Sequence, residues 1–155
     1  LINYFVSFFD KKKNKLSENK KNLIDYKNVE TNYNEIFCLW KTLSKAYNFN
    51  LKIFLQPIPS WFNKPLSIEE KTIFNILDNS NDSAHINLKK LSSIDSYNNF
   101  LSILEKISKK YDVDFIDLNK ELLNIKNIDK WLFVDRVHMT NQGYEQLADI
   151  VLKNI

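Results

Sequence analysis

The chain has 155 residues, of which 44% are hydrophobic and 14% aromatic. It can therefore bury one packed core but is too short for two ordinary domains, so we expect a single domain over residues 1–155. Glycine occurs once and proline three times, far below average usage, which excludes collagen-like and low-complexity classes. The 22 Lys and Arg outnumber the 19 Asp and Glu by only three, and this surplus does not indicate a nucleic-acid-binding surface.

The single cysteine, Cys38, excludes an intrachain disulfide framework and a cysteine-rich zinc site. Because it lies between Phe37 and Leu39, we expect it in the core. No apolar run is long enough to cross a bilayer, so we expect a soluble chain without a membrane span. The high Lys, Asn and Ile content is typical of AT-rich bacterial genomes, and the compartment stays open.

The first half of the chain predicts two strands and one helix. Residues 2–9 form a β-branched and aromatic run, which predicts a buried strand. The polar residues 11–34 predict an exposed loop or a weak helix. Apolar side chains then recur every three or four residues over 36–47, which predicts an amphipathic helix, and residues 51–55 predict a short strand.

The second half predicts three further helices and one strand. Ser67 and Glu70 have the spacing of a capping box that opens a helix ending near Leu77. A polar interval over 79–87 separates it from a helix over 100–110. A strand over 113–118 and an amphipathic helix over 144–151 complete the chain. Strands separated by helices indicate a parallel sheet covered on both faces.

The chemistry is concentrated just before the last helix, in the segment Trp131–Tyr144. Asp135 and His138 lie three residues apart there. On a turn, this spacing allows the carboxylate to accept a hydrogen bond from the Nδ1–H of the imidazole, which leaves Nε2 free to take a proton. An Asp-x-x-His spacing also occurs where the histidine only caps a helix or lies on the surface. Gly143, the only glycine, predicts a close approach between backbones.

The segment Asp135-Arg-Val-His138-Met-Thr-Asn-Gln-Gly143-Tyr resembles the C-terminal block of the SGNH (GDSL-type) hydrolase family. The order of a helix, Lys52-Ile-Phe-Leu-Gln-Pro57, a helix, Phe115-Ile-Asp-Leu118 and this block is also similar to that family, over most of the chain. The resemblance implies a flavodoxin-like three-layer α/β/α fold with a parallel sheet. It also implies that Asp135 and His138 are the catalytic pair of a Ser-His-Asp triad that hydrolyses acyl esters or O-acetyl groups on carbohydrates.

Two blocks of the family are not matched. Nothing matches its Gly-Asp-Ser block, so we expect the serine in sequence ahead of Leu1 and the fold to be incomplete at its N-terminus. If residues 4–10 correspond to the Gly-x-Asn-Asp block, Ser7 replaces the glycine and Phe9 replaces the asparagine of the oxyanion hole. Loss of one such donor typically costs about 100- to 1000-fold in rate. A non-catalytic scaffold or interaction domain of the same fold is therefore the alternative.

The remaining candidates follow from their places at the carboxyl ends of the predicted strands, where ligands bind in parallel sheets. Ser7 and Gln56 could contact substrate there, although Gln56 could instead cap a loop. Trp61 could line an acyl or sugar pocket or only pack within its loop. We expect Asp117 to be structural and His85 to be a surface residue. We expect neither a metal nor a cofactor, because the chain offers only two histidines and no ligand pattern.

Overall fold

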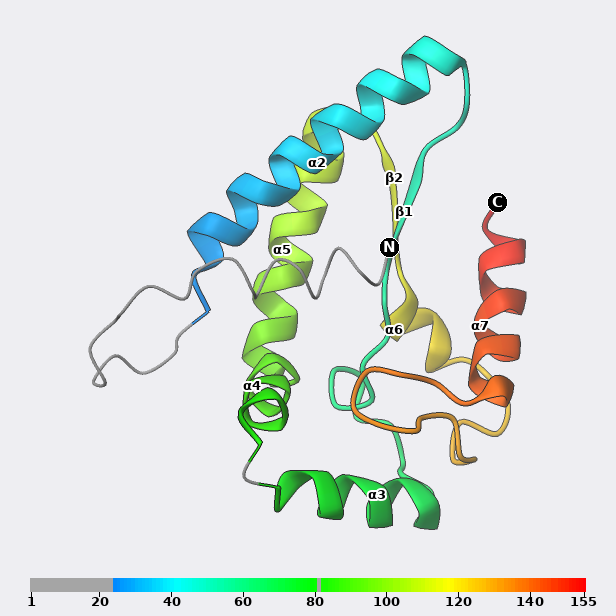
Figure 1. Ribbon diagram of the computed structural model, residues 1–155. Helices are drawn as coiled ribbons and strands as arrows, with labels where there is room; N and C mark the ends of the chain where they lie inside the picture. Colours follow the sequence, from blue (N-terminus) through cyan, green and yellow to red (C-terminus); the bar gives the residue numbers. More distant parts are fainter. Residues whose placement is uncertain (1–23, 81) are drawn as a thin grey trace, which may run out of the picture.

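A computed structural model describes residues 24–80 and 82–155 (Figure 1). Over these residues the fold is mixed α/β, with six helices and one two-stranded parallel sheet. The elements in chain order are α2 (Tyr26–Tyr47), β1 (Lys52–Leu55), α3 (Ile68–Asp78), α4 (Ser83–Leu91), α5 (Ile94–Tyr111), β2 (Asp114–Asp117), α6 (Leu118–Leu122) and α7 (Asn141–Lys153). The strand predicted over 2–9 lies outside the described residues.

The two strands run parallel, with Lys52 opposite Asp114 and Leu55 opposite Asp117. Alternate side chains serve two separate hydrophobic clusters. Ile53 and Phe115 pack against the cluster formed with α2 and α5. Phe54 and Ile116 pack against the cluster formed with α3, α6, α7 and the loop before α7. Helices therefore lie on both sides of the strand pair (Figure 1), as the apolar content of both strands predicts.

The first described helix begins at Tyr26, so residues 26–34 form a helix, which was one of the two alternatives predicted for residues 11–34, and this helix continues through the one predicted over 36–47. Asp25 caps this helix by accepting a hydrogen bond from the backbone N–H of Asn28 at 3.1 Å. Tyr26, Val29 and Tyr33 then pack against the core cluster. These three anchors are three and four residues apart, so they have the same helical period as the apolar residues of 36–47. Cys38 is exposed, contrary to the expectation that it is a core residue, because it lies on the outer side of α2.

The structure adds two helices that the sequence did not predict. α4 lies within and beyond the polar interval 79–87 and contributes no buried residue, and its apolar residues Ala84, Leu88 and Leu91 give only a short helical period. α6 has only five residues. The strand predicted to continue to Leu118 ends at Asp117, because the Asp117 side chain caps α6 by accepting from the backbone N–H of Asn119 at 3.1 Å.

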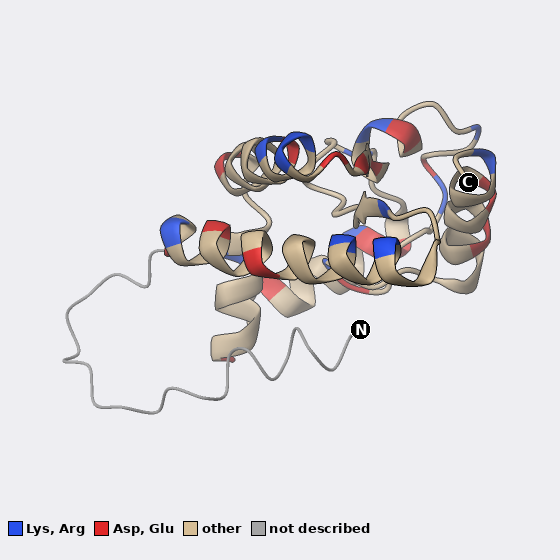
Figure 2. Ribbon diagram, turned by 90° about the horizontal axis from the view of Figure 1, so that it is seen from above, with Lys and Arg blue, Asp and Glu red and all other residues tan. Residues whose placement is uncertain are grey.

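The other predicted elements are confirmed. Ser67 and Glu70 form both hydrogen bonds of the capping box that opens α3, and α5 and α7 contain the predicted apolar positions. Lys and Arg positions are interspersed with Asp and Glu positions along the helices (Figure 2). None of the helices in the described ranges is long and apolar enough to span a membrane.

Candidate active site

Asp135 and His138 lie in a tight loop between Trp131 and α7. Phe133 and Met139 form an antiparallel bridge across the base of this loop. The backbone N–H of Val134 donates to the carbonyl of His138 at 3.0 Å, and that of Thr140 donates to the carbonyl of Leu132 at 2.8 Å. The loop is thus a small hairpin, and residues 135–138 form its tip.

The only glycine of the chain lies against the base of this hairpin. A Cβ atom on Gly143 would collide with the carbonyl oxygen of Leu132 and would approach the Cβ of Met139 at 3.0 Å. The backbone N–H of Gly143 donates to the Thr140 side chain at 3.1 Å, which caps α7. The predicted close approach between backbones is therefore confirmed, and it sets α7 directly behind the loop.

The Asp135 carboxylate organises the tip through both of its oxygens. Oδ1 accepts hydrogen bonds from the backbone N–H groups of Val137 at 2.8 Å and His138 at 2.7 Å. Oδ2 lies 2.7 Å from Nδ1 of His138. This contact orients the ring so that Nε2 is directed away from the carboxylate. Over residues 24–80 and 82–155 Nε2 has no hydrogen-bond partner, and 51% of the His138 side chain is exposed.

Opposing effects act on the ionisation of Asp135. Partial burial favours the neutral acid and is the largest single effect. The hydrogen bonds from the His138 ring and from the two backbone N–H groups favour the carboxylate and together outweigh burial, so the pKa of Asp135 lies below its ordinary value. Asp135 is therefore an anion at neutral pH, which is the state that stabilises a protonated imidazole.

Gln56 connects the loop to the end of β1. Its Nε2 donates to the carbonyl oxygen of Val137 at 2.5 Å. Behind it, the Asn119 side chain accepts from the backbone N–H of Ile58 at 2.9 Å and donates to Asp117 at 2.9 Å. The contact between Gln56 and Val137 thus places Asp135 and His138 at the carboxyl end of β1. This is the edge of the sheet where the sequence predicted them. Gln56 fixes the turn between Asp135 and His138, in line with the loop-capping alternative.

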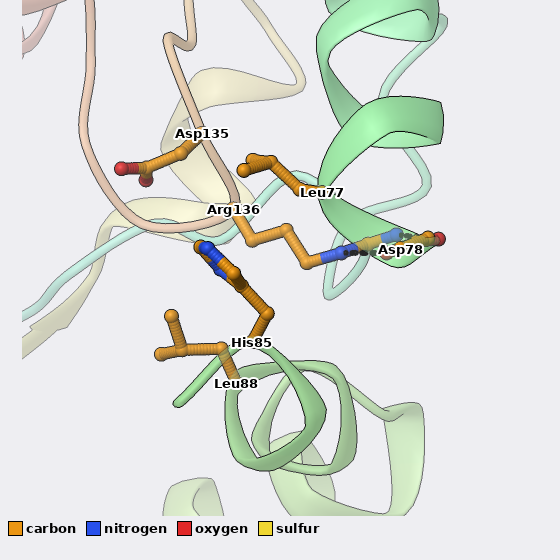
Figure 3. A pocket seen from close by; sticks show the side chains of 6 residues that line it. All are labelled: Leu77, Asp78, His85, Leu88, Asp135 and Arg136. Carbon is orange, nitrogen blue, oxygen red and sulfur yellow. Dashed lines mark hydrogen bonds and ion pairs between the residues drawn. The ribbon is translucent and has the colours of Figure 1, made fainter. Parts of the chain in front are cut away.

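Arg136 is held away from the candidate pair. Its guanidinium forms two hydrogen bonds to the Asp78 carboxylate, at 3.0 and 2.5 Å. Partial burial opposes ionisation of Asp78, but Arg136 and then Lys89 lower the pKa of this carboxyl below its ordinary value. Figure 3 shows the Asp135 carboxylate and the Arg136 guanidinium pointing to opposite sides. Because Arg136 is engaged by Asp78, it does not compete with His138 for Asp135.

His85 lies closer to the candidate pair than the sequence indicated. It is half-buried and lines a shallow pocket together with Leu77, Asp78, Leu88, Asp135 and Arg136 (Figure 3). The expectation of a solvated surface histidine was therefore incomplete. The sequence analysis missed this proximity because it did not predict α4, the helix that carries His85.

Of the other two predicted site residues, Trp61 is not brought to the pair. Trp61 is buried, with 6% of its surface exposed, and its ring packs against Tyr97 and Phe100 with centroids 5.4 and 5.9 Å apart. Its Nε1 donates to the carbonyl of Leu91 at 3.2 Å. This is the loop-packing alternative rather than a pocket wall. Ser7 lies outside the described residues.

Known proteins add no constraint on this site. No protein-family model matches the sequence, and no curated protein matches it either. Within the part of the chain that the structure describes, no three His, Cys, Asp or Glu side chains come together in a way that could hold a metal ion.

Proposed function

We propose that this chain carries the histidine and aspartate of an SGNH-type serine ester hydrolase. The observation that carries the proposal is the 2.7 Å contact between Asp135 Oδ2 and His138 Nδ1, in a loop joined to the end of a parallel strand. A carboxylate on Nδ1, and an exposed Nε2 that has no hydrogen-bond partner among the described residues, are what a histidine needs to act as a general base.

The fold supports the same proposal. A parallel strand pair with helices on both sides is compatible with the flavodoxin-like three-layer α/β/α architecture that the family resemblance implies. We propose that β1 and β2 are part of such a sheet, and that the serine is supplied by sequence ahead of Leu1.

In the proposed mechanism, the serine Oγ attacks the ester carbonyl carbon while Nε2 of His138 takes the hydroxyl proton. The imidazolium is stabilised by the Asp135 carboxylate and then donates this proton to the leaving alcohol as its C–O bond breaks. Water attacks the acyl-serine and gives its proton to Nε2. Breakage of the acyl–Oγ bond then returns that proton to the serine and releases the carboxylic acid. The substrate class is an acyl ester or an O-acetylated carbohydrate.

The test compares the full-length gene product with its His138→Ala and His85→Ala variants on a small chromogenic acetyl ester. Labelling by a fluorophosphonate, which reacts with activated serines whatever the natural ester, is measured in parallel. We expect His138→Ala to lower kcat by about 10⁶-fold and to abolish labelling. His85→Ala removes the other histidine of this sequence, which lines the pocket beside Asp135. It should lower kcat far less than His138→Ala, because His85 makes no hydrogen bond to Asp135 or His138 in the described structure. Equal hydrolysis and labelling in all three proteins would refute the proposal and favour the scaffold alternative.

A further inference from the structure

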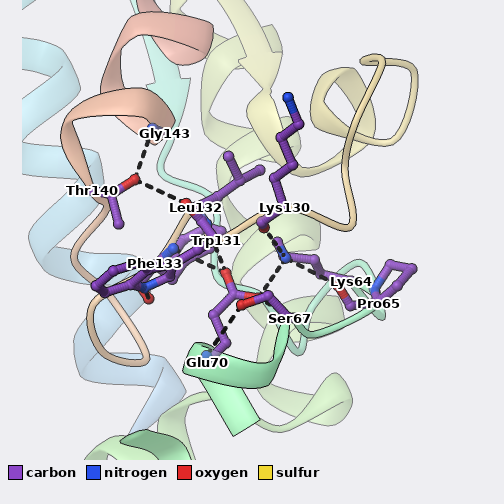
Figure 4. A network of polar contacts seen from close by, with 10 residues as sticks. All are labelled: Lys64, Pro65, Ser67, Glu70, Lys130, Trp131, Leu132, Phe133, Thr140 and Gly143. Atoms are coloured by element: carbon purple, nitrogen blue, oxygen red, sulfur yellow. Dashed lines mark hydrogen bonds and ion pairs between the residues drawn. The ribbon is translucent and has the colours of Figure 1, made fainter. Parts of the chain in front are cut away.

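A buried ion pair lies beneath the loop that carries Asp135 and His138. The side chains of Lys64 and Glu70 are both fully buried and lie 2.5 Å apart, Nζ to Oε2. The other two hydrogens of the Lys64 ammonium are also used, since Nζ donates to the carbonyl oxygens of Pro65 at 3.0 Å and Lys130 at 2.9 Å. The charge of Lys64 is thus fully compensated inside the protein (Figure 4).

Glu70 accepts more hydrogen bonds than the capping box of α3 needs. Its Oε2 accepts from the backbone N–H of Ser67 at 2.8 Å, which is the capping-box contact. Its Oε1 accepts from two further backbone N–H groups, those of Leu132 at 2.9 Å and Phe133 at 3.0 Å. These residues lie 62 and 63 positions further along the chain. One carboxylate therefore joins the start of α3 to the base of the loop.

The two N–H groups that Glu70 binds lie at the base of the hairpin. Phe133 is bridged to Met139, and the carbonyl of Leu132 accepts from Thr140. Only one residue, Val134, separates Phe133 from Asp135. A displacement of the backbone at Leu132 and Phe133 would therefore be transmitted directly to the Asp135–His138 contact.

A stabilising role alone explains this arrangement poorly. Buried ion pairs often contribute no more stability than well-packed apolar residues of similar volume, whereas their directional hydrogen bonds can select one conformation. Here the directional contacts end on the loop of the candidate pair.

We infer that Glu70, with its charge balanced by Lys64, is a positioning residue that holds the Asp135–His138 loop in its active geometry. This inference rests on the proposed function for its catalytic meaning. The geometry of the loop can nevertheless be measured without any activity.

The test uses variants that keep the buried charges balanced. Lys64→Met with Glu70→Met removes both charges together and leaves the N–H groups of Leu132 and Phe133 without their acceptor. The second double variant, Lys64→Met with Glu70→Gln, is also uncharged. Its glutamine provides a side-chain carbonyl oxygen that can accept from the N–H groups of Leu132 and Phe133. Ser67→Ala removes the cap of α3 without touching the loop contacts, and Glu69→Gln changes the exposed neighbour.

The first readout is the ¹⁵N spectrum of the imidazoles in the 155-residue chain, whose two histidines are His85 and His138. We expect His138 to be protonated on Nδ1 in the wild type, Ser67→Ala and Glu69→Gln proteins. This preference should be lost in the double variant with Glu70→Met and recovered in the double variant with Glu70→Gln. The second readout is ester hydrolysis by the gene product, where Glu70→Met should lower kcat by about 10- to 100-fold with little change in KM.

The outcomes separate the two proposals. An unchanged His138 signal in a folded Glu70→Met double variant would overturn the positioning role, whether or not the protein hydrolyses esters. If that variant does not fold, Glu70→Asp takes its place. It keeps the charge but draws the carboxylate back from the loop, and a wild-type His138 signal there would overturn the inference equally. Absence of hydrolysis in the wild type would count against the proposed function alone.

Discussion

Asp135 is the residue whose ionisation depends most directly on the loop geometry. Its pKa lies below the ordinary value of 3.8 because its hydrogen bonds outweigh the effect of burial. A carboxyl whose pKa is lowered by folding stabilises the folded state above that ordinary value, and this contribution is lost as the pH falls through the folded-state pKa. We therefore expect Asp135→Asn to reduce the free energy of unfolding at neutral pH, and the difference from the wild type to shrink below about pH 4.

Urea unfolding of both proteins over a series of pH values measures this difference. Asp129→Asn is the control, because Asp129 is an exposed acid in the stretch just before the loop. A difference between wild type and Asp135→Asn that stays constant into acid would show that the carboxylate form is not what stabilises the turn.

A second prediction at the residue scale concerns the stability of a Gly143 variant. A methyl group there meets a backbone carbonyl, that of Leu132, which cannot move without disturbing the hairpin. We expect Gly143→Ala to lower the free energy of unfolding by about 1–3 kcal/mol, the usual cost of overpacking. Thermal unfolding beside Gln142→Ala, at the exposed neighbouring position, measures the effect. A neutral or stabilising Gly143→Ala would mean that α7 does not pack this closely against the loop.

At the scale of the elements, a buried hydrogen bond joins α5 to the end of β2. The hydroxyl of Tyr97 donates to Asp117 Oδ2 at 2.5 Å. Burial first, and then this hydrogen bond, raise the pKa of Tyr97 above its ordinary value of 10.0. Because the raised pKa belongs to the folded state, the stabilisation is fully present below pH 10.0 and is lost as the pH rises through the folded-state pKa.

We expect Tyr97→Phe to lower the free energy of unfolding by about 1–3 kcal/mol, since it leaves a buried carboxylate oxygen without its donor. Chemical denaturation near neutral pH measures the loss, with Tyr47→Phe, at an exposed tyrosine (76%) of α2, as the matched control. Equal stability of the two variants would indicate that water replaces the Tyr97 hydroxyl without cost.

At the scale of the whole molecule, the sequence predicts features that depend on near neighbours. The Asp135–His138 contact and the Ser67–Glu70 capping box each join residues three positions apart, so spacing alone is enough to predict them. The contacts of Glu70 with the loop, and of Gln56 with Val137, join residues 62 and more positions apart. Nothing in local periodicity encodes such pairs, since they depend on how helices and strands pack. For the same reason, the sequence could not place His85 beside Asp135.

The outer face of α2 gives a last prediction for the whole molecule. Apolar side chains recur along it at helical spacing and stay exposed in the described structure: Ile36 (42%), Leu39 (59%), Trp40 (42%) and Tyr47 (76%). Exposed apolar side chains on one helix promote association between copies. We expect Leu39→Lys with Tyr47→Lys to reduce self-association of the 155-residue chain, as measured by light scattering against concentration, and to change its stability by no more than about 0.5 kcal/mol.

A buried residue of the same helix provides the comparison for the stability of the lysine variant. Phe37 is 1% exposed, and Phe37→Ala should cost about 3–5 kcal/mol because it leaves a cavity between α2 and α5. If the lysine variant instead lost as much stability as Phe37→Ala, the outer face of α2 would have to be covered in the folded chain. The reason is that a side chain in contact with water tolerates a lysine, whereas a packed side chain does not.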